Sequence, residues 1–227
     1  MLGARTCRLQ KVPASTEGNL SEKITQEGVI RAFLDASYKK SCGAASLSDI
    51  ASQLGIKKAS LYNHFESRED IITKTLESCA SYMEAISFIP ENMDGVAKKY
   101  PADTVLKGIA GRYIKMHEKS PMLEIYTFLE SQKYFDPQAK EIVSAESRKL
   151  VQQTITVLTS LEKNGKISAQ EDRIHPAAVW FCAALTDLMK THMILGRHTP
   201  EENRKDVQEK HLEQINHLIE YFTSTLQ

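Results

Sequence analysis

The amino-acid sequence predicts an all-α protein of about nine helices. Apolar residues recur every three or four positions through most of the 227 residues, which is the spacing of one helix face. Residues that commonly begin or end helices, such as Ser46 and Gly55, lie at the ends of several of these periodic segments. No alternating β-branched run is present, and Asp94-Gly95 stands alone rather than between two apolar stretches as a hairpin turn would.

The N-terminal part divides into a polar extension and a helix. Residues 1–20 lack helical periodicity and contain Pro13, so we expect a disordered or irregular arm there. From Ser21 to Lys40 apolar residues return at helical spacing, which predicts the first helix. A short loop over residues 41–45 follows it.

The next segment predicts two short helices joined by a tight turn. Ser46 and Asp49 have the spacing of a capping box, which begins the first of these helices. Gly55 ends that helix, at a position where a positive φ is usual. Leu61 and Phe65 lie four residues apart in the second helix and point back to the core. Because a helix-turn-helix of this shape places its second helix in the major groove, the segment is a candidate DNA-binding unit.

The rest of the chain predicts six further helices. Acidic residues after Ser67 suit the first turn of a long helix, which keeps its period up to Pro90. We expect a loop over Pro90–Pro101, because it holds two prolines and an Asp-Gly pair. His175-Pro176 and the capping-box sequence Thr199–Glu202 are the expected starts of the last two helices. The helices after the loop are expected over Ala102–Lys119, Pro121–Glu130, Pro137–Lys163, Pro176–Leu195 and Pro200–Phe222.

Composition limits the class of protein. The formal net charge is zero, but residues 1–75 hold 11 Lys and Arg against 8 Asp and Glu, so one end is weakly basic. The four cysteines are scattered without a C-x-x-C pair, which favours reduced thiols over a zinc site or a disulfide framework. The longest apolar run, Ala177–Leu185, is far short of a membrane span of about 20 residues, and no signal peptide is apparent. We therefore expect a cytoplasmic protein with no membrane association, metal or cofactor.

An ordered set of residues runs through the two short helices and into the next one: Ile50-Ala51, Gly55-Ile56, Leu61-Tyr62-Asn63-His64-Phe65, Arg68 and Glu69-Asp70-Ile71. In this order and spacing the segment resembles the TetR family of transcriptional regulators. One departure is Lys57, because the family often has Ser or Thr there as the N-cap of the recognition helix. The resemblance implies a DNA-binding domain over residues 21–67 and a ligand-binding and dimerisation domain over residues 68–227.

Polar and basic side chains of this segment are the candidate contacts to double-stranded operator DNA. Most contacts that hold a protein on DNA go to phosphates rather than bases. Taken alone, Lys57 and Lys58 would more often form a solvated charged face, and their place within two short helices is what favours DNA. The resemblance implies that Tyr62 and His64 face the DNA backbone. The candidates for phosphates are Lys58, Tyr62, Arg68 and Lys74, and those for base edges or nearby phosphates are Ser48, Lys57, Ala59, Ser60 and Asn63.

The last two helices carry more apolar residues than a single core face requires. In the final helix Val207, Leu212, Ile215, Ile219 and Phe222 form one stripe. A four-helix interface, with two helices from each subunit, would bury such stripes, and TetR-like proteins pair in this way. The alternative is that both stripes pack within the monomer.

Bulky, adaptable residues on the middle helices are candidates for a small-molecule site. In the TetR family the helices after the DNA-binding domain enclose such a site. A bound ligand there lowers the affinity for DNA, because it favours one distance between the two DNA-binding domains of the dimer. The candidate lining residues are Tyr113, His117, Tyr126 and Trp180, because each pairs an apolar body with a polar tip. Each of them taken singly is more often a core residue. We expect a small, hydrophobic effector.

The predicted function is therefore that of a homodimeric repressor released from its operator by a small molecule. An enzyme is not expected, since no nucleophile elbow, P-loop, dinucleotide-binding or H-E-x-x-H motif occurs. His192 and His198 are six residues apart, which misses the spacing of two metal ligands on one helix face. The alternative is a helical small-molecule-binding or carrier protein with a vestigial DNA-binding head, and this alternative predicts no salt-dependent DNA binding.

Overall fold

The computed structural model describes residues 25–227, and the arm predicted for residues 1–20 lies outside them. Over the described residues the chain forms nine α-helices and one 3₁₀-helix without a β-strand, which confirms the all-α class. The elements are α1 (Gln26–Lys40), α2 (Leu47–Gln53), the 3₁₀-helix η1 (Lys58–Asn63), α3 (Arg68–Ala85), α4 (Met93–Lys99), α5 (Ala102–His117), α6 (Met122–Gln132), α7 (Pro137–Lys163), α8 (Glu171–His198) and α9 (Glu201–Ser224).

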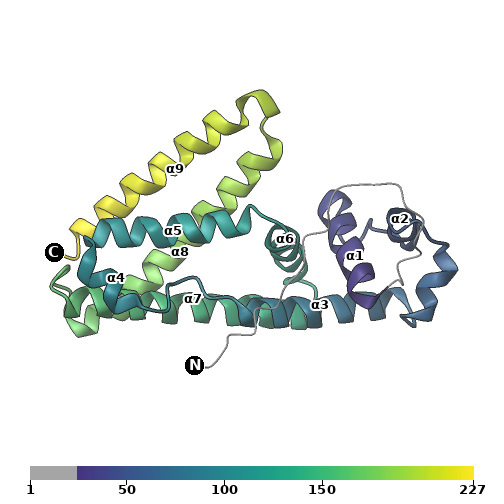
Figure 1. The fold of residues 1–227 in the computed structure, drawn as a ribbon, viewed down its shortest axis with the longest axis horizontal. Coiled ribbons are helices and arrows are strands. Elements are labelled where there is room, and N and C mark those ends of the chain that lie inside the picture. Colours follow the sequence, from purple (N-terminus) through teal and green to yellow (C-terminus); the bar gives the residue numbers. More distant parts are fainter. Residues whose placement is uncertain (1–24) are drawn as a thin grey trace.

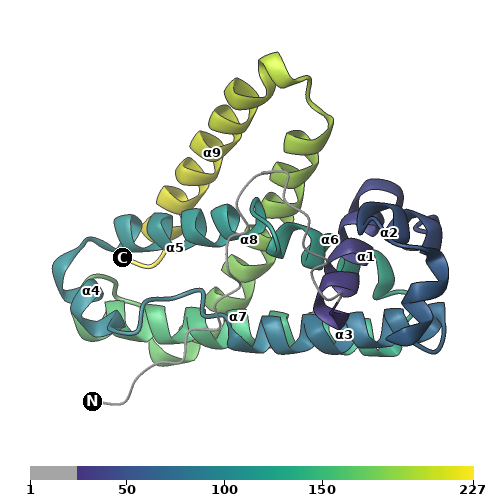
Figure 2. The same ribbon diagram turned by 45° about the vertical axis from the view of Figure 1, so that its right-hand side comes forward.

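The helices form a small head at one end of an elongated body (Figure 1). The head contains α1, α2, η1 and the beginning of α3. Helix α3 then continues out of the head along α7, so it belongs to both parts. Helices α8 and α9 form an antiparallel pair that projects from the body in both views (Figure 2). The head is therefore held by α3 and by the packing of α1 against α6.

One continuous hydrophobic core runs from the head into the body. In the head it is built from the buried faces of α1, α2 and η1, including Val29, Ile50 and Leu61. The ring of Phe33 on α1 meets that of Phe128 on α6 edge to face, with centroids 5.8 Å apart. Because both rings are buried, the junction between head and body is a packed interface rather than a flexible link.

The segment Pro90–Pro101, predicted as a loop, contains the short helix α4, so that prediction was wrong. The side chain of Asn92 begins the helix by accepting a hydrogen bond from the backbone N–H of Gly95 at 3.0 Å. Met93 and Ala97, four residues apart, bury one face of it against α5 and α7. Packing of this face outweighs the turn-forming composition of the segment.

The two C-terminal helices begin and end differently from the prediction. Helix α8 begins at Glu171, so Pro176 lies inside it, where it removes only the hydrogen bond to the carbonyl of Asp172. Thr199 closes α8 as its C-cap and does not cap α9, which begins after Pro200 without a side-chain cap. The expected capping box at Thr199 is therefore absent.

Helix α8 is the most apolar of the long helices in its central part. Among the described residues it is the one helix long and apolar enough, by length and composition, to cross a membrane. It packs against α5, α7 and α9. A single helix of this kind is weak evidence, because core helices of soluble proteins have the same composition.

The capping box that begins α2 is present as predicted, and an ion pair extends it. Ser46 Oγ accepts from the N–H of Asp49 at 3.1 Å, and Asp49 Oδ2 accepts from the N–H of Ser46 at 2.9 Å. Lys40 at the end of α1 lies 2.6 Å from Asp49 Oδ1. The hydrogen bond from Lys40 and those from Ser46 lower the pKa of Asp49 to about 2. The carboxylate thus joins the end of α1 to the start of α2.

This arrangement predicts a pH-dependent contribution of Asp49 to stability. Because its pKa is lower in the folded state, its stabilising effect is complete above the usual aspartate pKa and is lost as the pH falls toward about 2. Asp49→Asn should therefore lower the midpoint of urea unfolding at neutral pH, and the difference from the unmodified protein should shrink in acid.

The matched control is Asp35→Asn, which breaks an ion pair of the same 2.6 Å length with Lys39 but removes no helix cap. It should cost less stability at neutral pH. An Asp49→Asn deficit that stays constant down to a pH of about 2 would contradict the account.

Candidate nucleic-acid interface

The turn between α2 and η1 sets the angle between the two short helices of the head. Gly55 has a φ of 66°, which favours glycine. Its N–H donates to the carbonyl of Ser52 at 3.2 Å, and the N–H of Ile56 donates to the carbonyl of Ala51 at 2.9 Å. These two bonds form a Schellman motif, which satisfies the last carbonyls of α2 and turns the chain sharply.

The second helix of the predicted pair is a 3₁₀-helix of six residues. Its bonds span three residues, as in the N–H of Ser60 donating to the carbonyl of Lys57 at 2.9 Å. Lys57 occupies the N-cap position and makes no side-chain capping bond, in keeping with the departure seen in the sequence. Buried Leu61 and Phe65 anchor the helix to the core.

The outer face of α2 and η1 is exposed and polar. Tyr62 is 54% exposed although aromatic. The 3₁₀-helix is tied to α1 from behind, because Gln26 Nε2 donates to the carbonyl of His64 at 3.1 Å. Of the residues predicted to contact DNA, Ser48, Lys57, Lys58, Ala59, Tyr62 and Asn63 are exposed, and Ser60 and His64 are half-buried.

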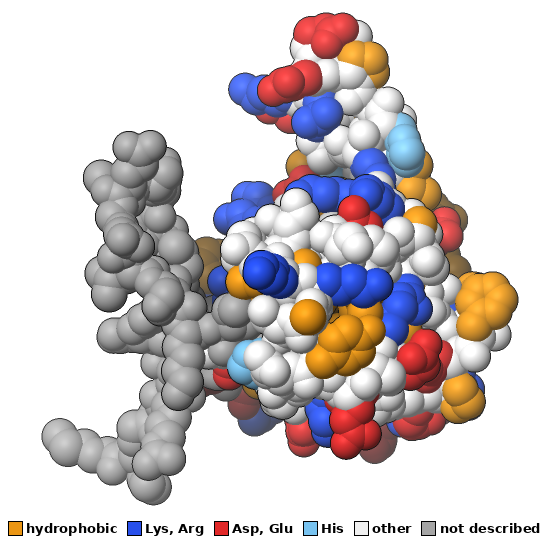
Figure 3. Space-filling view, turned by 90° about the vertical axis from the view of Figure 1, so that its right-hand side faces the viewer, with side chains coloured by type: hydrophobic (Ala, Val, Ile, Leu, Met, Phe, Trp, Pro, Cys, Tyr) orange, Lys and Arg blue, Asp and Glu red, His pale blue; other side chains and the backbone are white. Residues whose placement is uncertain are grey.

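Unpaired positive charge lies on this face. Within the described part of the chain, neither Lys57 nor Lys58 forms an ion pair, whereas Lys39 and Lys40 of α1 are each paired with an aspartate. Figure 3 looks onto the head end of the molecule: Lys and Arg side chains are spread across it, and Asp and Glu gather along the lower rim. The separation leaves the centre of the face suited to an anion.

Two predicted phosphate contacts are engaged elsewhere. The half-buried guanidinium of Arg68 donates to the carbonyls of Cys42 and Ala45, the second at 3.4 Å, and so holds the loop between α1 and α2. Lys74, on the second turn of α3, lies 2.9 Å from Glu77. The structure therefore gives Arg68 a positioning role inside the head, which its cationic character alone could not indicate.

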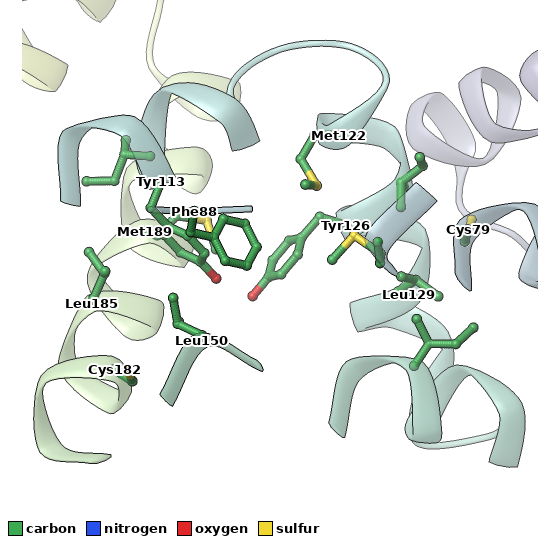
Figure 4. Packing of buried hydrophobic residues seen from close by; sticks show 14 of the residues in the cluster. Cys79, Phe88, Tyr113, Met122, Tyr126, Leu129, Leu150, Cys182, Leu185 and Met189 are labelled. Carbon is green, nitrogen blue, oxygen red and sulfur yellow. The ribbon is translucent and has the colours of Figure 1, made fainter. Parts of the chain in front are cut away.

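In the body, three of the four predicted ligand-lining residues come together. Tyr113 and His117 on α5 are fully buried, with ring centroids 4.3 Å apart. The Tyr126 ring from α6 meets His117 edge to face at 4.7 Å. In Figure 4 the hydroxyl groups of Tyr113 and Tyr126 point toward one another across a gap. Burial is the main cause that raises the pKa of both phenols, so both remain O–H donors at neutral pH.

Trp180 does not join this cluster. Its ring packs on Phe222 of α9 at 5.2 Å, and the residue is 54% exposed. Cys182, two residues further along α8, is buried beside Thr154 of α7, and positions two apart lie on roughly opposite faces of a helix. Trp180 instead lines an apolar groove of about 180 Å³ between α8 and α9, together with Leu188, Ile215, Leu218 and Tyr221.

Sequence reasoning missed Glu146, a buried acid on α7 that belongs to the body cluster. Tyr113 Oη donates to its Oε1 at 3.2 Å, and His117 Nε2 lies 3.8 Å from the same oxygen. A cavity of about 70 Å³ opens beside it. The signal was present in the sequence, because Glu146 interrupts the apolar stripe of Ile142, Leu150 and Val157 at helical spacing. In residues 25–227 no group of three or more His, Cys, Asp or Glu side chains could hold a metal ion.

Comparison with known proteins identifies the head. The sequence model described as "Bacterial regulatory proteins, tetR family" matches residues 38–74, which run from the end of α1 to the start of α3. The chain is 31% identical over 121 residues to IcaR of Staphylococcus epidermidis, a negative transcriptional regulator of the icaADBC biofilm operon. That match covers 44% of this chain and 63% of the relative. IcaR of Staphylococcus aureus is 31% identical over 86 residues, which cover 35% of this chain and 44% of that protein.

Solved structures share the fold of most of the chain. A TetR-family regulator from Mesorhizobium loti aligns with a TM-score of 0.62 at 19% identity, over 88% of this chain and 95% of that one. A transcriptional regulator from Saccharomonospora viridis, solved in complex with choline, aligns with a TM-score of 0.56 at 15% identity, over 83% and 93% of the two chains. Residues 38–74 thus match the TetR-family helix-turn-helix, and the chain has the fold of TetR-family regulators.

Proposed function

We propose that this protein is a homodimeric, cytoplasmic repressor that binds operator DNA through its two heads and releases it when a small molecule binds in the body. The observation that carries the proposal is the outer face of η1, where Lys57, Lys58, Tyr62 and Asn63 are exposed on a well-anchored helix-turn-helix. Exposed cations without ion-pair partners, beside an exposed aromatic hydroxyl, suit phosphate contacts.

The proposed contacts divide by position. Lys58 and Tyr62 bind phosphates and set the register of the head, with His64 facing the DNA backbone. Lys74 contributes at the edge of the interface. Arg68 contributes indirectly, since its guanidinium fixes the loop between α1 and α2. Base edges or nearby phosphates are met by Ser48, Lys57, Ala59, Ser60 and Asn63.

The proposed dimer interface is the groove between α8 and α9. The outermost apolar side chains that line it are exposed: Leu218 is 51% exposed, Tyr221 66% and Trp180 54%. A twofold copy of the same two helices would bury them in a four-helix interface. Two heads held by one such interface match two half-sites on DNA.

The proposed effector site is the cluster around Tyr113, His117, Tyr126 and Glu146. It lies under α6, and α6 carries Phe128, which packs on Phe33 of the head. A ligand that prefers one position of α6 would therefore prefer one position of the head. The Saccharomonospora viridis regulator of the same fold was solved in complex with choline, which supports a small-molecule ligand for this chain. On this view residues 21–67 form the DNA-binding domain and residues 68–227 the regulatory one, with α3 connecting them.

The first test is the salt dependence of binding to the DNA upstream of the protein's own coding sequence, measured by gel shift. Lys58→Ala should reduce the slope of log affinity against log salt by about 0.9 for each phosphate that the variant no longer neutralises, without changing stability. Arg68→Ala should instead lower the free energy of unfolding by about 1–3 kcal/mol, because two buried carbonyls lose a charged donor. Lys98→Ala, an exposed lysine on α4, is the matched control and should change neither quantity.

The absence of any shift at low salt would overturn the proposal of DNA binding and would favour the carrier with a vestigial head. A Tyr62→Ala variant that binds the DNA with the affinity and salt slope of the unmodified protein would instead contradict the placement of the phosphate contacts on the outer face of η1.

The dimer interface is tested by a charge placed in the groove. Leu218→Glu should convert the dimer to a monomer in sedimentation equilibrium, because a buried unpaired carboxylate would face the apolar partner surface. Asn216→Glu adds the same charge two residues away, outside the groove lining, and should leave the dimer intact. A Leu218→Glu variant that dimerises as well as the unmodified protein would place the interface elsewhere.

A further inference from the structure

We infer that the cavity beside Glu146 takes the ammonium head of an organic cation with an apolar tail. The inference rests on the proposed function and names the chemical class of its effector. The purely hydrophobic ligand expected from the sequence would leave the buried charge of this site without a partner.

The starting observation is an acid buried without a cation. The Glu146 side chain is only 6% exposed. Its hydrogen-bond donor is the neutral hydroxyl of Tyr113, at 3.2 Å. Within residues 25–227, no Lys or Arg nitrogen lies within 4.0 Å of its carboxylate. Because a carboxylate removed from water loses hydration free energy that a neutral hydroxyl replaces only in part, a cation here would be bound favourably.

A second, independent observation is a buried ring nitrogen without a hydrogen-bond partner. The ring of His117 is fully buried, and its Nδ1 lies 2.8 Å from the carbonyl of Tyr113. A carbonyl only accepts, so Nδ1 carries a proton. Among residues 25–227, His117 Nε2 has no hydrogen-bond partner and lies 3.8 Å from Glu146 Oε1. In the tautomer that leaves Nε2 unprotonated, an N–H donor of a ligand would satisfy it.

The size and walls of the cavity fit the head group rather than a whole effector. Its volume is about 70 Å³, and its lining includes the rings of Tyr113 and Tyr126 and the apolar side chains of Val143 and Leu150. Aromatic faces attract cations, and the hydroxyl groups of both tyrosines point into the gap between them (Figure 4). The aliphatic side chains provide an apolar surface for the first carbons of a tail.

The lining of the cavity also holds two lysines, and both contact a second acid, Glu130. Glu130 accepts from Lys133 Nζ at 2.9 Å and lies 2.9 Å from Lys190 Nζ. Glu146 is therefore the lining acid that no lysine of residues 25–227 contacts within 4.0 Å, and a cationic head group would bind beside it.

The test compares three probes of equal chain length: n-octylammonium, n-octanol and octanoate. Each is titrated calorimetrically into the full-length, DNA-free protein at neutral pH. The ammonium should bind at least about tenfold more tightly than the alcohol, and octanoate should not bind. Glu146→Gln should weaken octylammonium by about tenfold or more and leave octanol unchanged. Glu141→Gln, an exposed acid on the same helix, is the matched control and should behave as the unmodified protein.

Three outcomes would overturn the inference: equal affinities for octylammonium and octanol, a preference for octanoate, or no binding of any probe. The comparison of probes on the unmodified protein decides the matter even if Glu146→Gln fails to fold. Ligand affinity is read without DNA, so a failure of this inference is distinct from a failure of DNA binding, which the gel shift reports.

Discussion

The packed junction between α1 and α6 is the constraint on which the rest of the molecule depends. Phe33 and Phe128 meet there edge to face, both fully enclosed by the core. At the other end of α1, Arg197 of α8 stacks on the ring of Tyr38 at 4.4 Å and donates to its carbonyl at 2.6 Å. Because α1 carries the head and is held from both α6 and α8, a shift of either helix must be taken up by the head.

Polar side chains of the head and of the body have different roles. In the head, the guanidinium of Arg68 and the carboxylate of Asp49 complete the backbone hydrogen bonding of short helices and their loops. These groups make a small domain rigid where its hydrophobic core is thin. In the body, His117 Nε2, beside Glu146, has no hydrogen-bond partner among the described residues, in a region whose core is otherwise large and apolar. Unused capacity of this kind is typical of ligand sites rather than of structural networks.

The all-α class, the helix-turn-helix and most helix boundaries could be predicted because their signals are local. Ser46 and Gly55 each act within a few residues, and each occupies the predicted cap or turn. Helix α4 was missed because burial of Met93 and Ala97 depends on distant partners. Tertiary packing also decides the positions of the candidate site residues. Three of the four predicted ligand-lining residues lie together, but Trp180 lies apart from them. In the head, the contacts of Arg68 with the loop between α1 and α2 depend on packing in the same way.

A crystal structure of the protein bound to the DNA upstream of its own coding sequence tests the central claim most directly. The account predicts two copies joined through α8 and α9, with their heads in major grooves one or more helical turns of about 34 Å apart. Lys58 and Tyr62 would lie on phosphates, while Arg68 would still donate to the carbonyls of Cys42 and Ala45. A single bound head, or DNA seated on another face of the molecule, would contradict it.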